Sequence, residues 1–204
     1  MNRTEIINYL IKKNDYKSYL EIGINAGLNY QNIACESKTG VDPDRSAYHD
    51  FSTKKITSDE FFYDLEINTK FDIIFIDGLH LEHQVDKDIE NSFLHLSSNG
   101  TVVLHDCNPP TIHHARENFY DRSTPAAGKW NGTVWRSLVK VRCTREDLTT
   151  CVVDSDWGCG IIQQKISKVF NDISLDECLK WETFDKNRRN ILNLISLQQF
   201  LALY

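Results

Sequence analysis

Residues 71–80, FDIIFIDGLH, constrain the fold of this chain more than any other stretch. Five of the first six residues are apolar, which is the pattern of a strand buried on both faces of a parallel sheet. The run stops at Asp77, and His80 follows three residues later. Ligands of open parallel sheets bind just beyond the carboxyl ends of the strands. Asp77 and His80 are therefore predicted to lie where chemistry takes place, and both residue types bind metals and move protons.

Strand-like and helix-like segments alternate over the first 105 residues. The apolar spacing predicts strands at 18–22, 39–41, 54–57, 71–76 and 101–104. It predicts helices at 4–13, 28–35, from 58 and at 81–96, and further on at 111–119, 134–141 and 187–203. Residues 149–153 and 160–164 are typical of an antiparallel hairpin.

This order of elements predicts one α/β domain over residues 1–204, with no repeat or linker. We expect a doubly wound, mostly parallel, seven-stranded sheet of the Rossmann-like kind, ending in the antiparallel hairpin. The domain divides into an N-terminal helix (1–17), a core of sheet and helices (18–165) and a C-terminal helical extension (166–204). The apolar side of that extension is predicted to be core, or the surface of a homodimer.

Composition excludes some classes of function. The net charge is −6 and the basic residues are scattered, whereas binding of nucleic-acid phosphates requires a clustered basic face. No run is long enough to span a membrane and no signal peptide opens the chain. The six cysteines form no CxxC pair, so we expect reduced thiols and a cytoplasmic protein. Cys151 and Cys159 could meet across the hairpin.

Acids and glycines follow the first two predicted strands. In EIGINAG, Glu21 precedes Gly23 and Gly27; such glycines let the backbone approach a ligand, and the helix start offers free N–H groups. Asp42 ends the second strand, where an acid typically binds ribose hydroxyls. Asp44 is the alternative for that role, and a tight turn or a helix cap would explain each of these residues without a ligand.

Ser58 and Asp59 follow the third strand, on the ledge where an adenine ring would lie. Helix capping explains them nearly as well.

Together, EIGINAG, GVDPD, SDEFF, FDIIFIDGLH and TVVLHDCNPP resemble the class I S-adenosylmethionine-dependent methyltransferases. The resemblance covers residues of about 18–165 and is strongest to metal-dependent sugar O-methyltransferases. It implies that Glu21, Gly23, Asp42 and Asp59 contact S-adenosylmethionine.

The same resemblance implies a metal site. In the related sugar O-methyltransferases an Asp-Gly-x-His motif supplies a metal ligand and a general base, which matches Asp77 and His80. An acidic pair at the end of strand five completes that site. Here the pair is His105-Asp106, so Asp106 matches and His105 departs. A histidine ligand would shift the preference from Mg²⁺ toward Mn²⁺ or a later metal.

The chemistry of a hydroxyl acceptor agrees with these roles. A divalent cation on the hydroxyl oxygen lowers its pKa, and a nearby histidine takes the proton. We expect an O-methyltransferase whose acceptor is a sugar or glycan hydroxyl. The aromatic and amide residues of WNGTVWR suit a sugar, although core packing explains Trp135 better and leaves Trp130 open.

Two other functions remain open at this point, and the sequence argues against a third. A non-catalytic cofactor-binding partner of a glycosyltransferase would keep the glycines but need neither metal nor base. A catechol-type O-methyltransferase would use the same residues on a flat aromatic acceptor. A metal-dependent phosphohydrolase would need further histidine ligands and a basic phosphate site, which this sequence does not offer.

Overall fold

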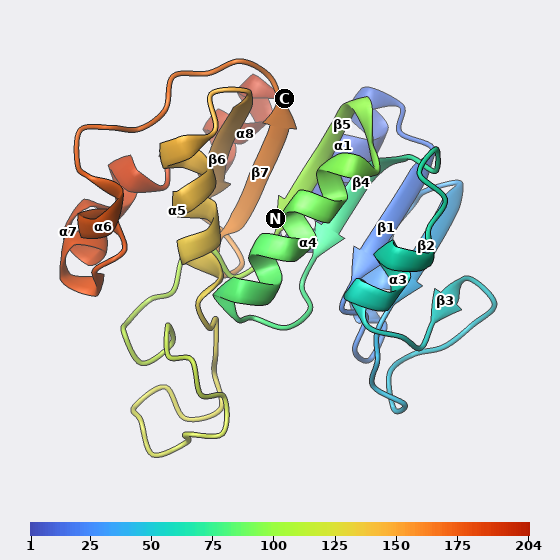
Figure 1. Cartoon of the computed structure of the whole chain (residues 1–204), viewed down its shortest axis with the longest axis horizontal. Coiled ribbons are helices and arrows are strands. Elements are labelled where there is room, and N and C mark those ends of the chain that lie inside the picture. Colours follow the sequence, from blue (N-terminus) through green and yellow to red (C-terminus); the bar gives the residue numbers. More distant parts are fainter.

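The computed structural model describes residues 1–204, which form one mixed sheet with helices on both faces (Figure 1). The sheet has eight strands in the order β3-β2-β1-β4-β5-β7-β6-β8. Strand β7 runs antiparallel to its neighbours β5 and β6, and all other neighbouring pairs are parallel. The predicted fold class is confirmed, but the predicted number of seven strands is wrong.

The strands are β1 (Ser18–Ile22), β2 (Ser37–Val41), β3 (Thr53–Lys54), β4 (Phe71–Ile76), β5 (Leu96–Leu104), β6 (Leu148–Val153), β7 (Cys159–Gln164) and β8 (Leu194–Ile195). The helices are α1 (Arg3–Asn14), α2 (Leu28–Gln31), α3 (Ser58–Asp64), α4 (Glu82–Leu94), α5 (Val134–Thr144), α6 (Leu175–Cys178), α7 (Trp181–Ile191) and α8 (Leu197–Leu203).

The eighth strand lies in the segment that the sequence predicted as one helix over 187–203. Helix α7 stops at Ile191, and Asn193 then adopts a left-handed conformation with φ of 47°. An α-helix cannot continue through such a residue. The chain instead forms β8 beside β6 and restarts as α8, whose first turn is capped by Ser196.

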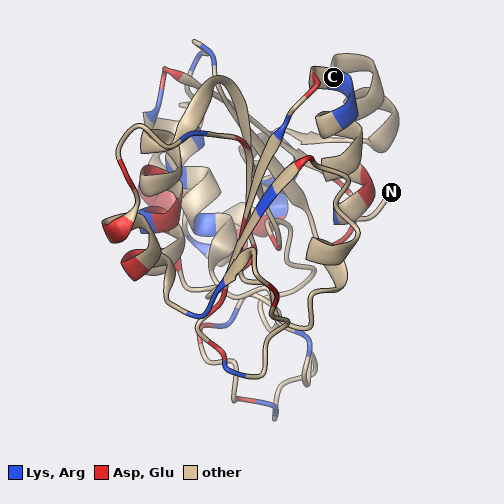
Figure 2. Ribbon diagram, turned by 90° about the vertical axis from the view of Figure 1, so that its right-hand side faces the viewer, with Lys and Arg blue, Asp and Glu red and all other residues tan.

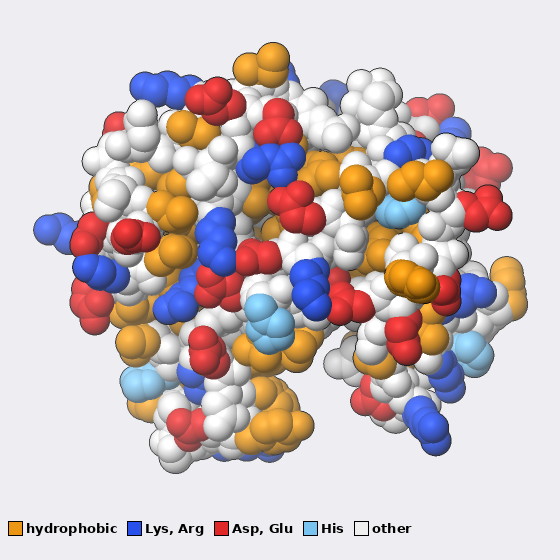
Figure 3. Space-filling view, in the orientation of Figure 1, with side chains coloured by type: hydrophobic (Ala, Val, Ile, Leu, Met, Phe, Trp, Pro, Cys, Tyr) orange, Lys and Arg blue, Asp and Glu red, His pale blue; other side chains and the backbone are white.

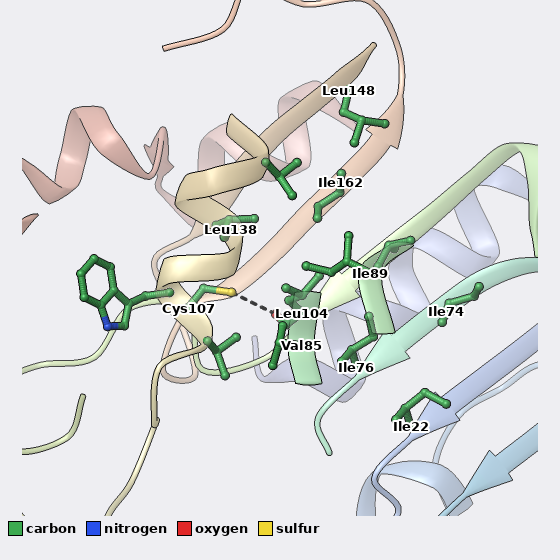
Figure 4. Packing of buried hydrophobic residues seen from close by; sticks show 14 of the residues in the cluster. Ile22, Ile74, Ile76, Val85, Ile89, Leu104, Cys107, Leu138, Leu148 and Ile162 are labelled. Atoms are coloured by element: carbon green, nitrogen blue, oxygen red, sulfur yellow. Dashed lines mark hydrogen bonds between the residues drawn. The ribbon is translucent and has the colours of Figure 1, made fainter. Parts of the chain in front are cut away.

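Strand β4 is buried on both faces, as its sequence predicted. Ile74 and Ile76 pack with Val85 and Ile89 of α4 in one core, which continues over β5, β7 and α5 (Figure 4). Ile73 and Phe75 point into a second core, formed with α1 and α8. Edge-on, the sheet therefore runs between two helical layers (Figure 2).

The two chain ends lie on the same side of the sheet, where α1 and α8 pack (Figure 2). None of the helices is both long and apolar enough to cross a membrane.

Residues 105–133, between β5 and α5, form a long segment without helix or strand, called here the β5–α5 loop. The predicted helix at 111–119 is absent, and only turns occur there. The carbonyl of His113, which a helix would use internally, accepts a hydrogen bond from the Arg116 side chain instead, and so does the carbonyl of Asn118. The loop extends past the carboxyl ends of the parallel strands (Figure 1).

Candidate functional site

A cleft of about 1440 Å³ opens at the carboxyl ends of β1, β2, β4 and β5. Figure 3 shows the hollow at the lower edge of the molecule. A pocket for one small ligand measures about 300–1000 Å³, so this cleft has room for a cofactor and an acceptor together. Of the predicted site residues, all but Gly27 line it: Glu21, Gly23, Asp42, Ser58, Asp59, Asp77, His80, His105 and Asp106.

Gly23 allows the turns after β1 and β4 to touch. Its φ is +90°, and a Cβ added there would lie 2.2 Å from the carbonyl oxygen of Asp77. Only glycine fits this position. Gly27, with φ of +75°, precedes α2 and packs against Tyr48, so the structure gives it a role in the turn.

Glu21 is 1% exposed and belongs to a buried hydrogen-bond network. Its Oε2 accepts from the hydroxyl of Tyr19 at 2.5 Å and from Nδ2 of Asn29 at 3.0 Å. Burial outweighs these hydrogen bonds and raises the pKa of Glu21 to about 8. Ionisation of this carboxyl group is therefore disfavoured relative to a carboxyl group in water.

The carboxylate of Asp42 stabilises two turns, the one after β1 and the one after β2 in which Asp42 itself lies. Its two oxygens accept from the backbone N–H of Asn25 at 2.8 Å and of Asp44 at 2.9 Å. Asp44 instead accepts from Ser46. Asp42 is thus the acid that is tied to the glycine turn, while Asp44 belongs to the next turn.

Ser58 and Asp59 do not cap α3, because Thr57 and Glu60 form its capping box. The side chain of Asp59 accepts from Gln84 and Lys87 of α4, each at 2.8 Å. Gln84 also donates to the hydroxyl of Ser58 at 3.2 Å. Both predicted residues thus border the cleft through contacts with α4.

The imidazole of His80 lies between two carboxylates. Its Nε2 is 3.2 Å from Oδ1 of Asp77, and its Nδ1 is 3.2 Å from Oδ2 of Asp106. Burial alone would lower the pKa of His80, but the two carboxylates outweigh it and raise that pKa. Asp106 itself has a left-handed backbone, with φ of 60°, which is uncommon for a residue other than glycine.

His105 is held from the other side by residues that the sequence analysis did not identify. Its Nε2 bonds to the carbonyl of Asp156 at 2.8 Å, and its Nδ1 lies 3.1 Å from the guanidinium of Arg3. Arg3 also contacts the carboxylates of Asp77 at 2.7 Å and of Asp156 at 3.0 Å. Burial would raise the pKa of Asp77, but His105 and His80 hold it well below its usual range.

The donor set fits a divalent cation. One ligand atom from each of Asp77, His80 and Asp106 lies within 4.8 Å of the others. Asp77 and Asp106 each offer a carboxylate oxygen, which suits Mg²⁺ or Mn²⁺, and the buried Nδ1 of His80 beside them lacks a hydrogen-bond partner. His105, a predicted ligand, is outside this group. Its Nδ1 lies 3.2 Å from Oδ1 of Asp77 and from Oδ2 of Asp106, but the same nitrogen also faces Arg3, and its Nε2 bonds to the carbonyl of Asp156.

Two residues of the β5–α5 loop also belong to the site. The ring of Trp130 stacks on His80, with centroids 5.0 Å apart. Asn131 is fully buried, and its Nδ2 donates to Oδ1 of Asp106 at 2.7 Å. The signal for both was present in WNGT, which the sequence analysis connected with a sugar acceptor instead. No pattern pointed to Arg3 or Asp156.

Comparisons with known proteins agree with this fold. A family model described as a methyltransferase domain matches residues 20–107. No curated protein sequence matches the chain.

Solved structures of methyltransferases share the fold. The O-methyltransferase TomG from Streptomyces achromogenes, which is involved in tomaymycin synthesis and was solved with S-adenosylmethionine, is 13% identical, with 80% of this chain and 79% of that chain covered and a TM-score of 0.57. The methyltransferase PaMTH1 from Podospora anserina is 16% identical, with 80% and 78% covered and a TM-score of 0.54. The O-methyltransferase from Bacillus cereus is 13% identical, with 78% of both chains covered and a TM-score of 0.51.

These identities are low, and the structural likeness shows the fold. The family match covers β1 to β5 and the predicted EIGINAG, GVDPD and FDIIFIDGLH motifs. The part of the chain from β1 to β5 therefore resembles a methyltransferase domain, and the predicted resemblance to the class I S-adenosylmethionine-dependent methyltransferases is confirmed.

Proposed function

We propose that this protein is an O-methyltransferase that moves a methyl group from S-adenosylmethionine to a hydroxyl of a sugar or glycan, with the help of a divalent cation. The observation that carries this proposal is the position of His80 between Asp77 and Asp106 in a cleft large enough for two ligands.

The β1–β2 side of the cleft would hold the cofactor. Gly23 keeps the turn after β1 free of a side chain, and Asp42 accepts a hydrogen bond from the backbone N–H of Asn25 in that turn. A carboxylate at the end of β2 suits ribose hydroxyls. Ser58 and Asp59, on the next ledge of the cleft, would border the adenine.

The β4–β5 side would hold the acceptor. Asp77 and Asp106 would bind the cation, and His80 would accept the proton of the hydroxyl through a ring nitrogen. The cation, when bound, supplies Lewis acidity toward the acceptor oxygen and positive charge that offsets the carboxylates raising the pKa of His80. The chain itself orients the imidazole through the stacked ring of Trp130.

Aromatic side chains support a sugar acceptor. Phe119, Trp130 and Trp157 line the cleft beside polar groups such as Asn2. A pyranose has an apolar face and a polar rim, so it fits such a mixed surface, and a flat aromatic acceptor of the catechol type would use the same rings.

The test is methyl transfer from labelled S-adenosylmethionine to a panel of sugars, glycosides and catechols, with and without a chelator. We expect transfer to at least one sugar, loss of transfer with chelator, and recovery with Mn²⁺ or Mg²⁺. His80→Ala should abolish turnover but keep the affinity for S-adenosylhomocysteine, whereas His83→Ala, an exposed histidine of α4, should remain active.

Other outcomes would contradict specific parts of the proposal. Transfer to catechols alone would refute the sugar acceptor. Transfer that resists the chelator would refute the cation. Tight cofactor binding without transfer to any acceptor would indicate the non-catalytic cofactor-binding module.

A further inference from the structure

Residues 130–133 of the β5–α5 loop contact two of the three groups proposed to act on the acceptor, His80 and Asp106. Trp130 stacks on His80 with an interplanar angle of 15°. Asn131 donates to Asp106 at 2.7 Å. The backbone N–H of Thr133 donates to the carbonyl of His80 at 2.8 Å. Four consecutive residues therefore fix both the ring and the backbone of His80 as well as the carboxylate of Asp106.

Gly132 makes this close approach possible. Its φ is +63°, and an added Cβ would lie 2.0 Å from the carbonyl oxygen of His80. Both the backbone conformation and the contact with another backbone atom require glycine. The position of residues 130–133 against His80 is thus built into the local chain.

Arg116 holds the rest of the loop around this contact. Its guanidinium donates to four backbone carbonyls, those of His113 at 2.6 Å, Ala127 at 2.8 Å, Lys129 at 2.9 Å and Asn118 at 3.1 Å. The loop has no helix or strand. Its conformation is therefore stabilised by these side-chain hydrogen bonds and not by a regular backbone pattern. A planar guanidinium can serve several acceptors at once in this way.

Arg116 is also connected directly to Trp130. Its own carbonyl accepts from Nε1 of Trp130 at 2.6 Å. The neighbouring carbonyl of His114 accepts from the N–H groups of Asn131 and Gly132 at 2.9 and 3.1 Å. The indole of Trp130 is therefore fixed at its edge by a hydrogen bond, and its ring stacks on the ring of His80. The centroid of the Phe119 ring lies 5.2 Å from that of the indole.

We propose that Arg116 is a positioning residue for the reaction: through the β5–α5 loop it sets Trp130 against His80 and Asn131 against Asp106. This inference rests on the proposed function, since it assigns the loop a part in that reaction. It gives Trp130, which also lines the cleft, the task of orienting the histidine. Groups that orient a reacting residue in this manner typically change activity about 10- to 100-fold when removed.

The test compares Arg116→Lys and Arg116→Met with Arg189→Met, an exposed arginine of α7. We expect Arg116→Met to lower kcat about 10- to 100-fold while the affinity for S-adenosylhomocysteine is unchanged. Arg116→Lys should recover part of kcat, because an ammonium group keeps the charge and three donors but lacks the planar fork. Arg189→Met should behave as the unmodified protein.

An NMR measurement reports on the loop without any turnover. In protein with labelled histidine, the stacked indole should shift the ring protons of His80, which are assigned by their absence in His80→Gln. Trp130→Leu should remove that shift. Arg116→Met should reduce the shift, and Arg116→Lys should reduce it less. The Arg116→Lys variant keeps the test possible if Arg116→Met does not fold.

An unchanged His80 signal together with an unchanged kcat in the Arg116 variants would overturn the inference. A loss of thermal stability alone, with kcat and the His80 signal retained in the folded protein, would do so as well. If the unmodified protein transfers no methyl group to any acceptor, the proposed function fails, whereas the NMR result still decides whether Arg116 sets the ring of His80.

Discussion

The two sides of the cleft are built differently. On the β1–β2 side, the side chains of Glu21 and Asp42 accept hydrogen bonds from residues no more than 17 positions away, namely Tyr19, Asn25, Asn29 and Asp44. Gly23 alone reaches across to the turn after β4. On the β4–β5 side, Asp77, His80 and Asp106 meet residues from far along the chain. Arg3 is separated from Asp77 by 74 positions and from Asp156 by 153.

This difference explains how much of each side of the cleft could be predicted from the sequence. Where a side is made of short local motifs, its geometry can be predicted from the sequence, because its glycines and acids follow strands at fixed spacings. A side assembled by tertiary packing shows only the residues at the strand ends. It also depends on more of the molecule, so substitutions far from the cleft should affect it.

The largest effect is expected where the β5–α5 loop meets His80. Gly132→Ala places a Cβ 2.0 Å from the His80 carbonyl at a φ of +63°, and strain plus overpacking should cost about 3 kcal/mol or more. Chemical denaturation measures this loss. Gly128→Ala, in the same loop with open space around it, should be nearly neutral, and equal losses in the two variants would contradict the close approach at Gly132.

The carboxyl groups of the two sides should respond to pH in opposite directions. Burial raises the pKa of Glu21 from 4.5 to about 8, so the folded state binds more protons than the unfolded state between these values. The contribution of Glu21 to the free energy of unfolding is therefore present below pH 4.5 and is lost as the pH rises to about 8. Asp77, whose pKa is lowered, contributes stability that is lost in acid.

Glu21→Gln tests this assignment. Relative to the unmodified protein, the variant should gain stability between pH 5 and 8, on the order of a few kcal/mol over the window. Denaturation at a series of pH values measures it, with exposed Glu36→Gln as the control. A constant difference between Glu21→Gln and the unmodified protein across the window would show that Glu21 is already ionised.

Ion pairs on the two sides should differ in strength. Arg3 is 29% exposed and pairs with Asp77 and Asp156, whose side chains are 16% and 17% exposed. Arg3→Met leaves both acids without this partner and should cost about 1–2 kcal/mol, less than a fully buried pair. Lys87→Met removes a pair with Asp59 that is exposed by about half and should cost about 0–0.5 kcal/mol. A larger loss in Lys87→Met would reverse the ranking of the two sides.

The sequence predicted the fold class and the strand-end residues because burial patterns and strand ends are local properties. Asp77, His80 and Asp106 were brought together by strand adjacency, which the alternation of elements implies. Arg3 and Asn131 could not be found in this way, because their partners are set by where α1 and the β5–α5 loop pack. The eighth strand was missed for a related reason, since Leu194–Ile195 is strand only beside β6.

The smallest effect distinguishes the two acids after β2. Both oxygens of Asp42 already accept hydrogen bonds from backbone N–H groups. In Asp42→Asn the side-chain NH₂ group would face one of these N–H groups, and the charged acceptor for the ribose would be lost. We expect S-adenosylhomocysteine to bind about 10-fold more weakly, or about 1.4 kcal/mol, in isothermal titration calorimetry. Asp44→Asn should change the affinity little, because Asp44 serves the turn at Ser46. If Asp44→Asn weakens binding more than Asp42→Asn, the ribose belongs to Asp44, and the β1–β2 side depends on a turn farther along the chain than its motif implies.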